Sequence, residues 1–234
     1  MLDAKDSNYF AAVFRDVEKY YKYLMLIWPQ YQDISKTCVH GFRNRLSRIK
    51  SEVSVSRELS ESELRELILE GEQATRLHLE LESILLFTSI LLDRIAACTQ
   101  YYFGKGSKQW QSFEAMKKYF EGYCKNKDLI PPNEKLIEVI TWLHENISKF
   151  RHLYVVHKHE NDYRVRLHFA TGFSGMEGDD EAYFNLWLLY PQGNEETVIS
   201  EKPQNVLNHL NLLLELWIDY LSSNRGKRNL TPNA

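Results

Sequence analysis

The sequence predicts a mainly α-helical protein: a helical bundle with one small antiparallel β-hairpin inserted before the last helix. Three observations predict this class. The 234 residues include only 10 glycines and 6 prolines, which cluster, so that long intervals contain neither helix breaker. Apolar residues in those intervals recur with the helical period. The alternation of apolar and polar residues that is typical of strands is confined to about 162–190.

Composition excludes several classes of protein. Hydrophobic residues make up 44% of the chain and aromatic residues 13%, which is too much apolar content for a disordered protein. The formal net charge of −3 argues against a protein held on duplex DNA by bulk positive charge. No apolar run is long enough to cross a membrane, and the first residues lack the pattern of a signal peptide. Because the three cysteines form no CxxC pair, we expect a cytoplasmic protein without structural zinc or disulfides.

Two helices are expected in an N-terminal helical extension, residues 1–55. The first runs from about Ser7 to Trp28, and Pro29 is predicted to interrupt it because proline lacks the amide that a helix interior needs. The second covers about 30–52 and carries four basic residues: Arg43, Arg45, Arg48 and Lys50. This cluster could contact the backbone of an RNA, or it could be an ordinary solvated helix face.

Residues 61–103 are expected to form one very long helix or two stacked helices. The half from Leu77 to Phe103 is apolar on most sides, so we place it at the centre of the bundle. Asp93 is the one acid in the apolar run 84–98, and a charge there needs a partner. A shorter helix is expected at 113–126.

The next helix is predicted to begin at Pro131 and Pro132, since proline is tolerated in a first helical turn, and to continue to about His159. Its apolar positions step by four and three, which predicts one continuous buried stripe. The stripe consists of Leu136, Ile140, Leu143, Ile147, Phe150, Tyr154 and His157.

The alternating segments at about 162–170 and 183–190 are expected to pair as a β-hairpin within an insertion that spans 161–191. The loop between them is rich in glycine and acidic residues. Pro191 is predicted to end the second strand, and the prediction places no further strand in the chain.

A last helix is expected at Pro203–Ser222, followed by a disordered tail at 223–234. Its inward positions are predicted to be Val206, Leu210, Leu213, Leu214, Trp217, Ile218 and Leu221. No internal repeat is visible, so residues 1–222 are interpreted as a single domain.

The end of the 131–159 helix holds the best candidates for chemistry. Arg151, Tyr154 and His157 step by three, which places them along one ridge of a helix. An arginine and a histidine at the edge of a buried stripe need polar partners, so they could form a structural hydrogen-bond network or a reactive site. The histidine spacings do not suit a metal ion, and we expect neither a metal nor a cofactor.

An arginine, a polar residue that is here His152, and a histidine six positions after the arginine resemble the Rx4-6H motif of the HEPN superfamily. The segment 86–104, followed by a short helix and then by 142–157, is similar to the approach to that motif. The resemblance covers about 75–160 and the closing helix. It leaves the N-terminal helices and the hairpin unexplained.

The resemblance implies a metal-independent endoribonuclease that acts as a homodimer on RNA, in the manner of a toxin or defence effector with an antitoxin or other protein partner. It implies that His157 is the general acid and base and that Arg151 holds the phosphate. His152 is a secondary polar contributor, and Tyr154 either supports the site or is a core aromatic. Asp93 could orient Arg151 or His157, or it could pair with Arg94 or with a lysine on the solvent side.

Two other functions remain open. A non-catalytic HEPN-like module could bind a partner protein or a nucleotide, with Trp187 and Tyr190 of the hairpin as its recognition surface. Alternatively, the chain is a helical scaffold in which Arg151 and His157 only hold the core together.

Overall fold

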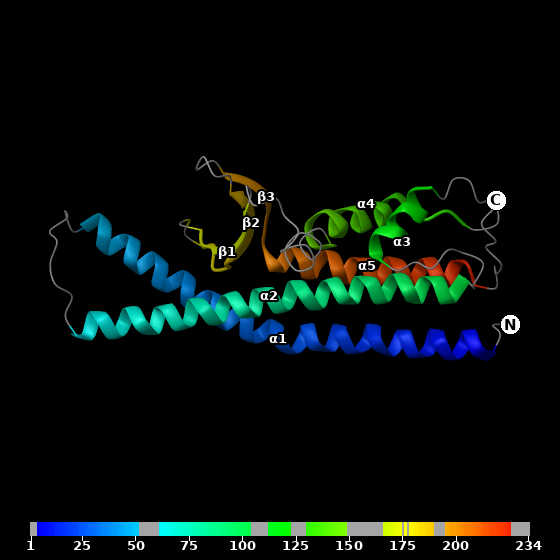
Figure 1. Cartoon of the computed structure of the whole chain (residues 1–234), viewed down its shortest axis with the longest axis horizontal. Helices are drawn as coiled ribbons and strands as arrows, with labels where there is room; N and C mark the ends of the chain where they lie inside the picture. The colour runs from blue at the N-terminus through cyan, green and yellow to red at the C-terminus, as the bar shows by residue number, and fades with distance from the viewer. Residues whose placement is uncertain are drawn as a thin grey trace. The chain divides into compact units, whose positions relative to one another are not determined.

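The chain is described by a computed structural model (Figure 1). The structure describes residues 4–51, 61–103, 112–122, 130–148, 166–174, 176, 178–189 and 195–225. More than half of the 234 residues lie in helices, which confirms the mainly α-helical class. The chain divides into two compact units. Unit 1 comprises Met1–Leu24, Leu85–His157 and Gln204–Ala234, and unit 2 comprises Met25–Ile84 and Lys158–Pro203.

Helix α1 is continuous from Ala4 to Ser51, with Pro29 inside it. The prediction that Pro29 separates two helices was therefore wrong. An internal proline removes one helical hydrogen bond and costs about 3 kcal/mol. The turns on either side are well packed, since Leu24 is 3% exposed and Tyr31 is 0% exposed. Their burial offsets the cost of the proline.

Helix α2 spans Glu61–Phe103 as one element of 43 residues, which settles the choice between one helix and two. Its second half is buried as its apolar composition predicts. The buried apolar side chains of α2 are Leu77, Leu81, Ile84, Leu85, Leu91, Leu92, Ile95, Ala96, Cys98 and Phe103.

In unit 1, the first part of α1 packs antiparallel to the second part of α2. Tyr9 stacks on Tyr101 with ring centroids 5.5 Å apart, whereas Tyr20, further along α1, contacts Phe87, which comes earlier in α2. Aromatic contacts at both positions join the two helices.

Helix α5, Pro203–Ser223, lies alongside α2 in unit 1 (Figure 1). A buried polar contact joins them: Trp217 Nε1 donates to Thr99 Oγ1 at 2.8 Å, and Thr99 Oγ1 donates to the Ile95 carbonyl at 2.7 Å. The predicted last helix is thus confirmed, although Ile218, which was expected to face inward, is 48% exposed.

The described residues of unit 1 include two shorter α-helices. Helix α3 spans Phe113–Glu121 with Ser112 as its N-cap, and α4 spans Glu134–Leu143 with Asn133 as its N-cap. The expectation that the prolines open this helix was wrong, because both precede the cap. The side-chain oxygen of an asparagine can accept a hydrogen bond from an amide of the first helical turn, and here Asn133 Oδ1 accepts from the Leu136 amide at 2.7 Å. Proline has no side-chain oxygen for this role.

Unit 2 contains a three-stranded antiparallel sheet in the order β1-β2-β3. Its strands are β1 Arg166–Gly172, β2 Tyr183–Leu189 and β3 Glu195–Glu201. The predicted hairpin corresponds to β1 and β2, which pair with Phe169 opposite Leu186. The prediction of a hairpin alone was wrong, because β3 adds a third strand.

Strand β3 was not predicted because it is acidic and has little apolar content. Only Ile199 among its described side chains is buried, and glutamates stand at both ends, so no alternation is visible. A β-bulge further disturbs the pattern: Leu186 lies opposite Ile199, but the next residue, Trp187, lies opposite Thr197.

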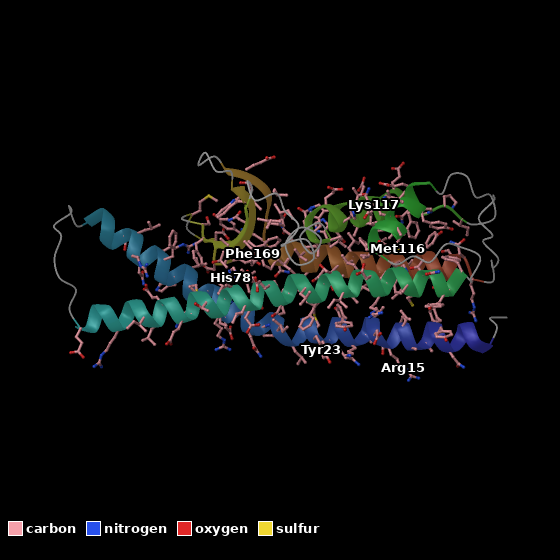
Figure 2. The ribbon with its side chains drawn as sticks, viewed as in Figure 1. Arg15, Tyr23, His78, Met116, Lys117 and Phe169 are labelled. Carbon is pink, nitrogen blue, oxygen red and sulfur yellow. The ribbon has the colours of Figure 1, made fainter. Side chains whose placement is uncertain are left out.

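The segment before β2 is bound to α1 through the backbone carbonyl and the backbone amide of Ala182. Tyr31 Oη donates to the Ala182 carbonyl at 2.7 Å, and the Ala182 amide donates to Ser35 Oγ at 2.7 Å. On β1, the ring of Phe169 lies 4.8 Å from that of His78 in α2 (Figure 2). The sheet therefore contacts both long helices within unit 2.

The Thr99 contact can be tested by Thr99→Val, which keeps the side-chain volume but leaves the buried Trp217 N–H without an acceptor. We expect the free energy of unfolding in urea to fall by about 1–3 kcal/mol. The control is Thr75→Val, which removes the same kind of hydroxyl-to-carbonyl bond from an exposed position of α2. Equal effects of the two substitutions would contradict the assigned role of Thr99.

Candidate functional site

The four residues predicted to form the catalytic site and its edge, Arg151, His152, Tyr154 and His157, lie outside the described residues. The structure does describe the helix that leads to them. Leu136, Ile140, Leu143 and Ile147 are buried, which confirms the predicted stripe as far as Ile147.

The helix leading to this segment ends, within the described residues, in a π-helical turn at His144–Ser148. π-Helical turns are rare in proteins, and those that occur often lie at functional sites. The buried Ser89 Oγ of α2 donates to the Ile147 carbonyl at 3.4 Å, and His144 Nδ1 lies 3.2 Å from Glu145 Oε1. The last described turn before the motif is therefore held against the central helix.

A stacked ring pair holds α4 against α5. The rings of Trp142 and His209 lie 3.7 Å apart at an interplanar angle of 7°, and His209 Nδ1 donates to the Asn205 carbonyl at 2.8 Å. That bond fixes the orientation of the imidazole. At the other end of the same helix pair, the buried Asn224 accepts from the Ile130 amide at 2.8 Å. The sequence pattern predicts neither contact.

Asp93 has a role that the sequence interpretation missed. Its carboxylate is half-buried, and Oδ1 accepts a hydrogen bond from the amide of Phe113, the first residue of α3, at 3.0 Å. A carboxylate at a helix N-terminus is favourable both as an acceptor and as a negative charge. Its predicted role toward Arg151 or His157 concerns residues outside the described ranges and stays a prediction.

Arg43 in unit 2 binds the loop between β1 and β2. Its Nη1 donates to Asp180 Oδ1 at 2.9 Å, and its Nη2 donates to the carbonyls of Met176 and Asp179, each at 2.5 Å. Its side chain is 23% exposed. The guanidinium therefore holds a loop of its own chain in place.

Of the other members of the predicted basic cluster, the structure describes only the side chain of Arg45. Arg45 forms an ion pair with Glu70 of α2. The side chains of Arg48 and Lys50 lie outside the described residues. The two described arginines are thus paired with groups of unit 2. The sequence alone does not show that these groups, and not a ligand, are their partners.

A small cavity of about 130 Å³ lies between α1 and α2 in unit 2. It is lined by Thr37, Cys38, Gly41, Phe42, Arg45, Glu70, Gln73, Ala74 and Phe173. Burial raises the pKa of the Cys38 thiol, so the thiol stays protonated and unreactive at neutral pH. The charged groups in the wall are already paired with each other, and the cavity supplies no reactive group of its own.

Two further properties concern the described part of the chain only. Within it, no three histidine, cysteine, aspartate or glutamate side chains gather to hold a metal ion. None of its helices is long and apolar enough to cross a membrane. Trp187, proposed for a recognition surface, is half-buried in β2, and Tyr190 lies outside the described residues.

Comparison with known proteins found no match to a protein-family model, to a curated protein or to a solved structure.

The loop that Arg43 holds is also sensitive to acid. Lys202 Nζ donates to Asp179 Oδ1 at 2.7 Å, and this bond lowers the pKa of Asp179 below its usual value of 3.8. The stabilisation is present above that value and is lost as the pH falls through the lower, folded-state pKa. Wild-type protein should have a higher Tm than Asp179→Asn at pH 7, and the difference should shrink as the pH falls below 3.8 into strong acid.

Thermal unfolding at a series of pH values measures this difference. Asp219→Asn, at an exposed position of α5, is the control. A Tm difference for Asp179→Asn that stays constant from pH 7 to strong acid would show that the Asp179 carboxylate is not the source.

Proposed function

We propose that the chain is a HEPN-like, metal-independent endoribonuclease that uses Arg151 and His157. The supporting observation is the order of elements: the long helix α2, the short helix α3, and α4 leading toward the Arg-His motif, followed after the sheet by the closing helix α5. This is the helix order that the resemblance implies. The buried stripe that α4 shows through Ile147 has the same sequence spacing as the positions that continue to His157.

The proposed chemistry needs no metal because RNA carries its own nucleophile. The 2′-hydroxyl gives its proton to a base while its oxygen attacks the adjacent phosphorus, the bond from phosphorus to the 5′-oxygen breaks, and the departing 5′-oxygen takes up a proton from an acid. The products are a 2′,3′-cyclic phosphate and a 5′-hydroxyl. A histidine can carry these protons because its unperturbed pKa is about 6.5.

Each residue has one role in this proposal. His157 moves the proton, and the Arg151 guanidinium binds phosphate oxygens in a bidentate manner and stabilises the charge that they gain in the transition state. His152 adds a polar contact, with Tyr154 and Asp93 as supporting residues. RNA binding does not depend on Arg43, because its donors already hold the loop before β2.

The cellular setting is part of the same proposal. The enzyme acts in the cytoplasm as a toxin or defence effector, where an antitoxin or another protein partner would control it. Two copies of the chain would bring two arginines and two histidines to one phosphate site.

His157→Ala tests catalysis separately from stability. If His157 is the acid and base, it must reach the substrate from the edge of the stripe, so RNA cleavage should be abolished while the Tm stays within a degree or two of wild type. His40→Ala, at an exposed position of α1, should cleave like wild type. Residual cleavage in His157→Ala, or a loss of about 1–3 kcal/mol of stability, would favour the non-catalytic alternatives.

Arg151→Lys tests the phosphate contact. Lysine keeps the charge but loses the planar fork, so cleavage should fall by at least tenfold if Arg151 binds phosphate with two nitrogens. The control is Arg76→Lys, at an exposed position of α2. An unchanged rate in Arg151→Lys would contradict the proposed role.

The proposed shared site requires a homodimer. Light scattering at micromolar concentration should give about twice the chain mass of 27.7 kDa. Mixing inactive His157→Ala with the weakened Arg151→Lys should also give more activity than Arg151→Lys alone if each copy contributes to the other's site. A monomer that cleaves RNA would contradict the shared site.

A further inference from the structure

One exposed face of α1 in unit 1 carries basic residues in helical register. Arg15, Lys19 and Lys22 follow one another at spacings of four and three, so they share one side of the helix. All three are exposed, and Figure 2 shows Arg15 on the side of α1 away from α2. Between Tyr9 and Arg15 the exposed residues include Ala11 and Ala12, which are too small to obstruct an extended ligand.

The acidic residues nearby reduce this charge but do not cancel it. Asp16 faces the edge of the helix, where its Oδ2 lies 3.7 Å from Arg94 Nε of α2. Glu18 is exposed and is a neighbour of both Arg15, three residues before it, and Lys22, four residues after it. The three cations therefore outnumber the one carboxylate among them, and the row keeps a net positive charge.

Aromatic rings line the flank next to these cations. Tyr23 is 38% exposed, with Phe87 at 5.6 Å and Tyr20 at 5.8 Å behind it. Tyr9 is 45% exposed and is stacked on Tyr101 at an interplanar angle of 13°. Each exposed ring is thus backed by another ring, which fixes its orientation. Along the helix the two rings are about 21 Å apart at 1.5 Å per residue.

Lys19 connects the two kinds of residue. Its Nζ lies 5.4 Å from the ring centroid of Tyr20 and 5.8 Å from that of Tyr23. A planar base that stacks on Tyr23 would displace the ammonium, which a flexible four-carbon stem can carry to a neighbouring phosphate. The site can therefore bind a phosphate and a base at adjacent positions.

We propose that this face, the α1 stripe formed by Tyr9, Arg15, Lys19, Lys22 and Tyr23, binds single-stranded RNA. A single strand repeats an anionic phosphate and an accessible base, which matches a basic row beside aromatic platforms. Duplex RNA keeps its bases stacked, and an anionic membrane has charge but no base. The inference rests on the proposed ribonuclease function for the choice of RNA over single-stranded DNA, and it names a surface where the substrate is held.

The test uses the full chain with His157→Ala, so that binding is measured without cleavage. A fluorescein-labelled, uridine-rich, single-stranded RNA is titrated and its anisotropy recorded at several salt concentrations. Lys19→Glu combined with Lys22→Glu should weaken binding by more than tenfold. It should also reduce the slope of log K against log salt by about 1.4, or roughly 0.7 for each phosphate that is no longer neutralised. The control pair is Lys118→Glu with Lys135→Glu, both exposed in unit 1, and it should have a smaller effect on both quantities.

The aromatic platform is tested by Tyr23→Ala against Tyr23→Phe. The first should weaken binding about 5- to 150-fold, and the second should not, because the ring rather than the hydroxyl stacks on the base. Circular dichroism checks that each variant is folded. If Tyr23→Ala does not fold, the lysine pair alone decides the outcome, because both of its side chains are exposed.

Equal affinity of the Lys19 and Lys22 variant and its control would overturn the inference, and so would tighter binding to duplex RNA or to phosphatidylserine vesicles. The two proposals fail differently. If the α1 stripe binds RNA but the wild-type chain does not cleave it, the ribonuclease proposal is refuted and the binding surface stands. If cleavage and binding are both unchanged in the Lys19 and Lys22 variant, the binding surface is refuted and the ribonuclease proposal stands.

Discussion

The antiparallel pairing of α1 with α2 is the interaction on which the other elements depend. In unit 1, aromatic pairs such as Tyr9 with Tyr101 join the two helices. In unit 2, Arg45 of α1 pairs with Glu70 of α2. Neither helix could bury its apolar residues alone. Most of the stability of a helix in a protein comes from packing its apolar face against another element. The shorter helices and the sheet that the structure describes are attached to this pair or to a helix packed on it.

Single polar residues on the long helices determine where the shorter elements attach. Along α2, Ser89 binds the π-helical turn, Asp93 binds the start of α3, and Thr99 binds Trp217 of α5. Buried polar groups need partners, so each of these contacts has one favourable register. The same contacts would hold the helix leading to Arg151 and His157 against the centre of the unit, which is the support that a precisely aligned acid and base would need.

Much of the helical architecture can be predicted from the spacing of apolar residues. The period of three and four predicts α2, α5 and the buried stripe of α4 because apolar burial contributes most to the stability of each. Pro29 shows where a local rule fails, since packing on both sides outweighs one missing hydrogen bond. Strand β3 was missed because Ile199 is its one buried residue among the described side chains of an acidic edge strand. The hydrogen-bond partners of charged side chains were not predictable either. In the sequence, Arg43 and Asp93 are candidates for an RNA contact and for support of the catalytic site. The structure shows Arg43 bound to a loop and Asp93 bound to a helix terminus.

The most direct test of the central claim is the chemistry of the RNA ends. Purified wild-type protein would be incubated with a defined RNA in excess chelator, and the products examined by mass spectrometry. The account predicts a 2′,3′-cyclic phosphate on one fragment and a 5′-hydroxyl on the other. It also predicts no cleavage of the same strand when the ribose at the cleavage site lacks its 2′-hydroxyl. A 5′-phosphate product, or cleavage that persists without the 2′-hydroxyl, would contradict the assignment to Arg151 and His157.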